Sequence, residues 1–168
     1  MILEASQIVT APIVSAEGKK LAEVDRIVFD GQEAKIAGFQ VKQRAVIQRF
    51  ASLDYNDVLD CERQAVIVDV NQKFSRDLKH FDSLHQHFGA VLGVTAKTES
   101  GERLGRVSDL LFEVESGLIV RFCLGQLLKE RIVPRQFLVA ITPKAIVFKD
   151  IVNQPIFDQA ATQAAPAI

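Results

Sequence analysis

A chain of 168 residues that is 48% hydrophobic and 24% charged has the composition of a globular protein, which excludes general disorder. The 20 Lys and Arg residues are balanced by 21 Asp and Glu residues, and the formal net charge is −1. This balance excludes the strong overall positive field that drives nonspecific binding to nucleic acids or anionic membranes, although it is compatible with a local basic patch.

The N-terminal stretch MILEASQIV lacks the basic-then-apolar layout of a signal peptide, and no apolar run approaches the roughly 20 residues of a membrane-spanning helix. We therefore expect a cytoplasmic protein without a transmembrane segment, with a peripheral position at a membrane as the other setting. Cys61 and Cys123 are isolated thiols, which suits a reducing compartment and provides neither a disulfide framework nor a metal site. We interpret both as small, buried apolar residues.

The first predicted elements come from a stretch that occurs twice, at residues 18–41 and 101–124. The two stretches align without a gap, and the identical pairs are Gly18 and Gly101, Leu21 and Leu104, Val24 and Val107, Phe29 and Phe112, Ile36 and Ile119, and Phe39 and Phe122. The match continues after a short deletion, where Leu53, Val58 and Ala65 correspond to Val133, Leu138 and Ala145. The sequence therefore predicts two copies of one unit of about 80 residues.

Within each copy the apolar pattern is that of short strands. LAEVDRIVFD and KIAGFQV flank one turn, and LGRVSDLLFE and LIVRFCL flank another, so we expect a β-hairpin in both copies. Further strands are predicted at VIQRFASL and AVIVDV, and at ERIVPRQFLV and AIVFKD. About five short strands per copy, with little helix to cover them, favour a small closed barrel because closure removes exposed sheet edges.

A helix is predicted between the copies, at SRDLKHFDSLHQHF. Helical spacing places Leu78, Phe81, His85 and Phe88 on one side of this segment, and Ser75 is suited to cap its start. After Pro155 the chain consists mostly of small residues with no anchor for a core, and we expect it to be frayed.

The second copy carries a pattern that resembles the PRC-barrel domain family. Gly105, Val107 and Asp109 stand at alternate positions, followed by an apolar pair, Phe112, an acid and a glycine turn. The first copy departs from this pattern, since Ala22 and Arg26 stand where the glycine and the aspartate would be. The resemblance implies an all-β fold of two small PRC-barrel-like domains in tandem, at residues 1–73 and 89–155, joined by a short amphipathic helix at 74–88 and followed by a flexible tail at 156–168.

The PRC-barrel family is similar to the cytoplasmic domain of the photosynthetic reaction centre H subunit and to the C-terminal domain of a ribosome maturation factor. The resemblance implies a non-enzymatic adaptor or scaffold that docks onto a protein complex, at a membrane surface or a photosynthetic assembly. The alternative that it implies is a ribosome- or RNA-associated maturation factor. It implies no catalytic residue and no cofactor, and open strand edges make self-association a further expectation.

Six basic residues are the candidate binding site. Lys42, Arg44 and Arg49 follow the first hairpin, and Lys129, Arg131 and Arg135 occupy the corresponding segment of the second copy. On a barrel they would form one positive stripe per copy, able to pair with phosphates or with an acidic protein surface. Solvated strand faces explain the same charges, and aromatic residues for base stacking are scarce, with no Trp and one Tyr. We therefore expect protein docking rather than nucleic-acid binding.

Two further groups of residues have simpler explanations than chemistry. In the predicted helix His85 and His87 point apart, and His80 and His87 are about 10 Å apart, so we expect a polar rim rather than a metal site. The alternatives left open are pH-sensitive docking of the helix and a metal-dependent activity there. Acids recur around both hairpins, and because no His, Ser or Lys completes a catalytic set we expect no enzyme. These acids are Asp25, Asp30, Glu33, Asp109, Glu113 and Glu115.

Overall fold

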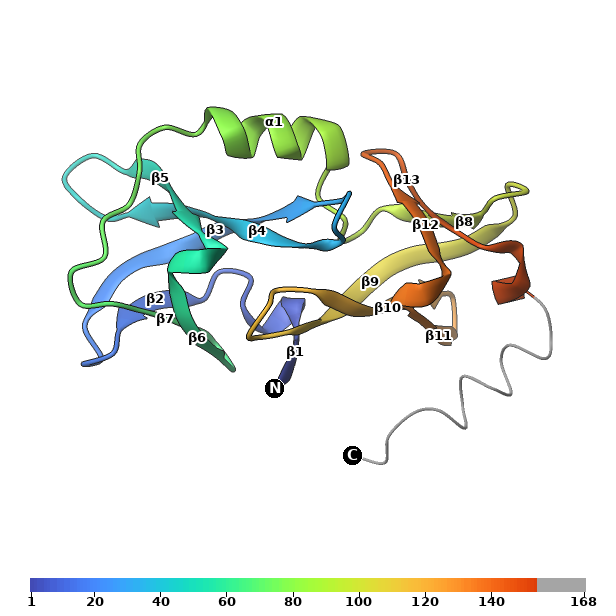
Figure 1. Cartoon of the computed structure of the whole chain (residues 1–168), viewed down its shortest axis with the longest axis horizontal. Coiled ribbons are helices and arrows are strands. Elements are labelled where there is room, and N and C mark those ends of the chain that lie inside the picture. The colour runs from blue at the N-terminus through green and yellow to red at the C-terminus, as the bar shows by residue number, and fades with distance from the viewer. Residues whose placement is uncertain (154–168) are drawn as a thin grey trace.

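The computed structural model describes residues 1–153 and consists of two β-sheets in tandem with one short α-helix between them (Figure 1). This confirms the mostly-β fold expected from the sequence. The expected tail at 156–168 lies outside the described residues. No helix within residues 1–153 is long and apolar enough to cross a bilayer.

We call the two repeats unit 1 and unit 2. Unit 1 contains β2 (Pro12–Ser15), β3 (Lys20–Asp30), β4 (Lys35–Gln43), β5 (Arg49–Asp54), the 3-10 turn η2 (Tyr55–Asp57), β6 (Val58–Glu62) and β7 (Ala65–Val68). Unit 2 contains β8 (Thr95–Thr98), β9 (Arg103–Glu113), β10 (Ile119–Gln126), β11 (Lys129–Pro134), η3 (Arg135–Phe137), β12 (Leu138–Ile141), β13 (Ala145–Phe148) and η4 (Asp150–Asn153). Strand β1 (Ile2–Glu4) and turn η1 (Ala5–Gln7) precede unit 1, and helix α1 (Lys79–Phe88) precedes unit 2.

The two units have the same topology. Their strand orders are β5-β4-β3-β2-β7-β6 and β11-β10-β9-β8-β13-β12, and in each unit the first and last strands of the sequence repeat pair in parallel, β2 with β7 and β8 with β13. The short deletion in the sequence repeat falls in one hairpin loop, which spans residues 44–48 in unit 1 and 127–128 in unit 2. The sequence repeat is therefore a duplication of the fold.

Neither strand order closes into the barrel that the sequence was expected to form. Strands β5 and β6 lie at opposite ends of the strand order of unit 1, although η2 connects them directly along the chain. The outer edge of β5 is instead used by the segment before α1: the Ser52 amide donates to the Ser75 carbonyl at 2.7 Å, and the Ser75 amide donates back at 3.1 Å. A ladder cannot continue around the sheet where another segment occupies its edge.

Each unit is covered by the segment that precedes the other unit in the chain. Strand β1 pairs antiparallel with β9 of unit 2, although the sequence placed residues 1–73 in one domain. Helix α1 packs on β3 and β4 of unit 1 (Figure 1). The helix starts at Lys79, later than predicted, and the expected cap is wrong: Ser75 is in the bridge to β5, and its hydroxyl accepts from the Asp77 amide at 3.2 Å.

An approximate two-fold axis relates the two units. Lys35 and Leu118, which are equivalent in the repeat, form an isolated antiparallel bridge with each other. Around it the Ile36 amide donates to the Gly117 carbonyl, and the equivalent Ile119 amide donates to the Ala34 carbonyl, both at 2.9 Å. Buried residues of both units form one continuous hydrophobic cluster. The two repeats therefore share a core.

Candidate interaction surfaces

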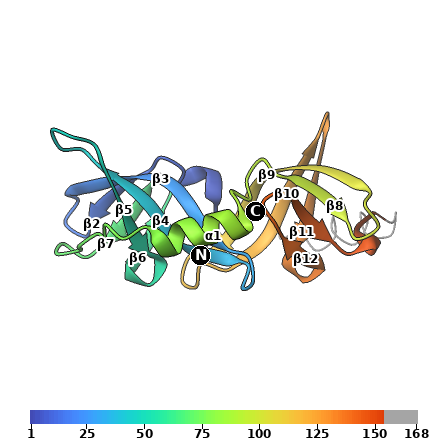
Figure 2. The same cartoon turned by 90° about the horizontal axis from the view of Figure 1, so that it is seen from above.

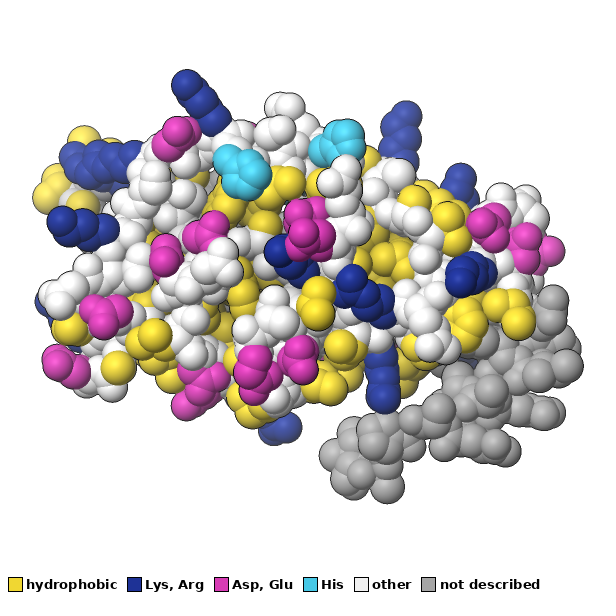
Figure 3. All heavy atoms as spheres, in the orientation of Figure 1, with side chains coloured by type: hydrophobic (Ala, Val, Ile, Leu, Met, Phe, Trp, Pro, Cys, Tyr) yellow, Lys and Arg dark blue, Asp and Glu magenta, His cyan; other side chains and the backbone are white. Residues whose placement is uncertain are grey.

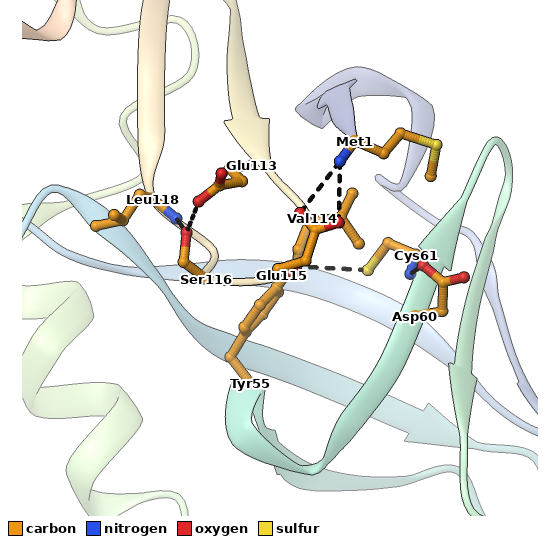
Figure 4. Close-up of polar contacts among 9 residues, drawn as sticks. All are labelled: Met1, Tyr55, Asp60, Cys61, Glu113, Val114, Glu115, Ser116 and Leu118. Atoms are coloured by element: carbon orange, nitrogen blue, oxygen red, sulfur yellow. Dashed lines mark hydrogen bonds and ion pairs between the residues drawn. The ribbon is translucent and has the colours of Figure 1, made fainter.

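The junction between the units is built from equivalent positions that have diverged. Tyr55 in η2 reaches from unit 1 into the β9–β10 turn of unit 2, where its hydroxyl donates to the Val114 carbonyl at 2.8 Å (Figure 4). Its ring fits against Gly117, where an added Cβ would lie 3.0 Å from the ring carbons. Gly117 also has a φ of +72°, so two independent constraints favour glycine there. Tyr55 therefore fixes the position of the unit 2 hairpin.

Arg135 in η3 occupies the position in unit 2 that Tyr55 has in unit 1. Its guanidinium donates across the junction to the carbonyls of Ala34, at 2.9 Å, and Glu33, and within unit 2 to the carbonyl of Ile119 at 3.3 Å. The five fixed donors of an arginine are suited to bind several carbonyls at once. Each unit thus holds the hairpin turn of the other.

The covering segments are held at one aligned pair of positions, Arg26 and Asp109, at which the two copies carry opposite charges. Asp109 on β9 accepts hydrogen bonds from the amide and the hydroxyl of Ser6 in η1. At the equivalent position on β3, Arg26 forms an ion pair with Asp82 of α1 at 2.8 Å. The opposite charges of this pair therefore match the different segments that cover the two units.

Glycines make room for the helix on unit 1. A Cβ added to Gly38 would lie 2.2 Å from the Leu53 carbonyl oxygen and 2.5 Å from the Phe81 ring. Phe81 and Phe88 are buried beneath α1, as the helical spacing predicted, and His85 is half-buried. A Cβ on Gly31 would lie 2.4 Å from the Phe88 ring. The helix is therefore packed directly onto the backbone of unit 1.

The six predicted basic residues make different contacts in the structure. Arg135 lies in the junction, and the Arg131 guanidinium donates to the Val152 carbonyl at 3.2 Å. The Lys42 ammonium is 3.8 Å from the Asp25 carboxylate, and the Arg44 guanidinium is 4.0 Å from the Glu23 carboxylate. Arg49 and Lys129 are exposed at the ends of their hairpins, and no described residue forms an ion pair with them. Their role in binding stays a prediction.

The hairpin loops beside these basic residues carry a feature that the sequence analysis missed. Four aliphatic side chains there are exposed, three of them almost fully, and we call them the tip residues: Val46, Ile47, Leu127 and Leu128. A sequence cue existed, since both hairpin loops contain an adjacent aliphatic pair, and the strand that follows each loop begins with a basic residue, Arg49 or Lys129. The deletion in the repeat hid the equivalence of the two pairs.

The histidines lie on α1 without converging. His80 and His87 are exposed, and the rings of His87 and Phe88 meet edge to face with centroids 4.7 Å apart. Burial, together with the nearby Arg26, lowers the pKa of His85, whose Nδ1 is buried without a hydrogen-bond partner among the described residues. Within residues 1–153 no three His, Cys, Asp or Glu side chains are arranged to hold a metal ion.

The acids around the hairpins bind neighbouring groups of the chain. Asp30 accepts from the amides of the turn that follows it, Glu33 pairs with Lys35, and the Ser116 hydroxyl donates to Glu113 at 2.6 Å. Glu115 binds the terminal ammonium of Met1 at 3.0 Å, which lowers the pKa of that carboxyl (Figure 4). Asp30, Glu33, Glu113 and Glu115 thus lie at hairpin ends, as interpreted, whereas Asp25 and Asp109 lie within β3 and β9 and bind Gln40 and Ser6.

Both cysteines are buried, as expected. Burial raises the pKa of the Cys61 thiol to about 11, and the Tyr55 hydroxyl lies 3.9 Å from its sulfur. Burial likewise raises the pKa of Cys123 to about 11. At neutral pH both side chains are therefore neutral thiols that pack as apolar residues.

These features define a class of duplicated β-sheet protein in which two units with one topology are joined across a two-fold junction. In the comparison with protein families, residues 2–74 match the model of the PRC-barrel domain. The match covers β1 and unit 1, whereas the motif that resembled the family in the sequence stands in unit 2. No curated protein matches the chain.

Proposed function

We propose that the protein is a non-enzymatic adaptor that docks onto a protein complex through the side of the molecule that carries strands β6 and β12, and that unit 2 is a second, diverged PRC-barrel-like domain. The observation that carries the docking proposal is a pair of sheet edges with which no further strand of residues 1–153 pairs. Strands β6 and β12 end the two strand orders, and each has an exposed aliphatic side chain at the equivalent position, Leu59 and Val139. Free edges with apolar side chains accept a partner strand or segment.

The charge around the unit 1 edge indicates the kind of partner. Asp54, Asp57 and Glu62 are exposed in and beside η2 and β6, and the exposed Arg63 directly after β6 leaves acids in excess along this segment. Figure 3 shows acidic side chains spread around this part of the molecule. A partner with Lys or Arg beside an apolar segment would complement this edge, whereas the phosphates of RNA would be repelled by it.

Affinity capture from native lysate tests the docking edges. The double variant Leu59→Lys and Val139→Lys places charges on both edges, and Val70→Lys changes an exposed aliphatic residue outside the edge strands as the control. We expect the edge variant to lose the captured proteins about tenfold relative to the control, because an edge lysine blocks strand addition. Equal capture by both variants would overturn the proposal.

The alternative is a ribosome- or RNA-associated factor. It is supported by the exposed Arg49 and Lys129, and it is weakened because Arg131 and Arg135 bind backbone carbonyls of this chain. Nuclease treatment before capture separates the two functions. Ribosomal particles that disappear with nuclease support the alternative, and protein partners that persist support the adaptor.

A further inference from the structure

The two hairpin loops each present an adjacent pair of aliphatic side chains to solvent. Val46 and Ile47 are 107% and 69% exposed, and Leu127 and Leu128 are 103% and 101% exposed. Isolated apolar residues on a surface are ordinary, but two adjacent, exposed aliphatic residues at both equivalent loops form a repeated feature. Such side chains have no packing role within the described chain.

Both loops project from one side of the molecule. Figure 2 shows the β4–β5 and β10–β11 hairpins rising from the same side, and β6 and β12 on the opposite side. This follows from the approximate two-fold relation, because equivalent loops point the same way along the axis. A single flat surface can therefore contact both pairs of tip residues at once.

Basic side chains surround both loops. Arg44 and Arg49 lie at the two ends of the first loop, and the Arg44 guanidinium is 4.0 Å from the Glu23 carboxylate. At the second loop, Lys129 follows the aliphatic pair, and Leu127 lines a shallow hollow together with Arg103 and Arg106. Glu130 is the nearest acid along that hairpin. Each loop thus combines an apolar tip with flanking residues among which basic side chains outnumber acidic ones.

We propose that the two hairpin tips insert into the surface of a bilayer that contains anionic phospholipids, with the flanking arginines and lysine at the level of the headgroups. Aliphatic side chains enter the acyl region, and long basic side chains keep their charge at the headgroups. One tip alone is a weak anchor. Two tips on one rigid body bind the membrane more tightly than either tip alone, because the second insertion is intramolecular.

The chemistry of the tips favours lipid over the other large partners. Two separate aliphatic pairs do not form the continuous surface of about 1,000 Å² that a specific protein interface requires. None of the tip residues is aromatic, so none can stack on a base of RNA. A lipid surface needs no matching shape and accepts two separate points. The inference does not rest on the proposed protein-docking edges, which lie on the opposite side.

Vesicle flotation of the full chain tests the inference. The probes are vesicles of phosphatidylcholine alone and of phosphatidylcholine with phosphatidylserine. The tip variant combines Val46→Ser, Ile47→Ser, Leu127→Asn and Leu128→Ser; asparagine suits position 127, where φ is +50°. Leu59→Ser with Val139→Ser is the control on the opposite side. All these positions are exposed, so folding is unaffected.

We expect the wild type and the control to float with the phosphatidylserine vesicles and the tip variant to lose at least about tenfold in bound fraction. Replacing Arg44, Arg49 and Lys129 by Gln should reduce binding to the level seen with phosphatidylcholine alone, because the preference for anionic lipid comes from these charges. The inference is wrong if the wild type does not float, or if the tip variant floats as well as the control. Loss of a protein or RNA partner by the tip variant, without flotation of the wild type, would assign the tips to that partner instead.

Discussion

Removing one oxygen atom from the junction, by Tyr55→Phe, tests the coupling of the two units. The Val114 carbonyl in unit 2 would lose the donor that now lies 2.8 Å away, while the ring would keep its place beside Phe39, with centroids 6.0 Å apart. A buried acceptor left without a donor costs about 1–3 kcal/mol. We expect about 1.5 kcal/mol, because Tyr55 and Val114 are both buried and the second contact of the hydroxyl, to Cys61, is long.

For a chain of this size, a loss of about 1.5 kcal/mol lowers Tm by roughly 3–6 °C. Differential scanning calorimetry measures this shift, and Ser83→Ala on the exposed side of α1 is the control, for which we expect less than about 0.5 kcal/mol. Hydrogen exchange should show lower protection in both units. A Tm change below about 1 °C, or lower protection in unit 1 alone, would refute the reasoning.

Three further predictions concern the helix and the thiols. Gly38→Ala should destabilise the protein by about 1–3 kcal/mol in urea unfolding, because its Cβ would meet the Leu53 carbonyl and the Phe81 ring; an unchanged midpoint would contradict this packing. Burial lowers the pKa of His85 in the folded state, so folding favours its neutral form. The free energy of unfolding should therefore fall as the pH drops below 6.5, the ordinary pKa of histidine. Tm measured against pH should lose this dependence in His85→Leu but keep it in His80→Leu. Cys61, with its pKa raised to about 11, should resist thiol reagents at neutral pH until urea unfolds the protein, and rapid labelling of the native chain would show that it is accessible.

The strands and the duplication could be predicted because they leave local marks in the sequence. Phe29 and Phe112, with the turns that follow them, repeat a hairpin whose apolar spacing is that of strands, and the structure has β3–β4 and β9–β10 there. The parallel strands β2 (PIVS) and β8 (TAKT) were missed because neither has the run of apolar residues that revealed their equally short partners β7 (AVIV) and β13 (AIVF). Short strands of that kind carry little local pattern.

The helix start and the open sheets could not be predicted for a different reason. Ser75 has the side chain of a helix cap, but its backbone satisfies the edge of β5 at Ser52, and this tertiary contact takes precedence over the local preference. The same contact occupies the edge that barrel closure would need. Both outcomes depend on where the linker runs, which the spacing of apolar residues does not specify.

The candidate surfaces were predicted only in part. Arg135 was expected at a binding stripe on the basis of its charge, whereas its guanidinium binds carbonyls of the other unit. Nothing local distinguishes such an arginine from a solvated one, because its acceptors are backbone atoms far along the chain. The tip residues were visible in the sequence as aliphatic pairs in loops, yet only the two-fold arrangement shows that both pairs face the same side.

The central claim is that the two repeats fold as one body across the two-fold junction. The sequence contains one Tyr and no Trp, so the intrinsic fluorescence comes from Tyr55, which lies in this junction. Equilibrium unfolding in urea, followed by Tyr55 fluorescence and by far-ultraviolet circular dichroism on the same samples, tests the claim most directly. We predict that the two signals give superimposable transitions with one midpoint. A fluorescence transition at lower urea than the loss of β-structure would show that the junction opens while the units stay folded, and would contradict the claim.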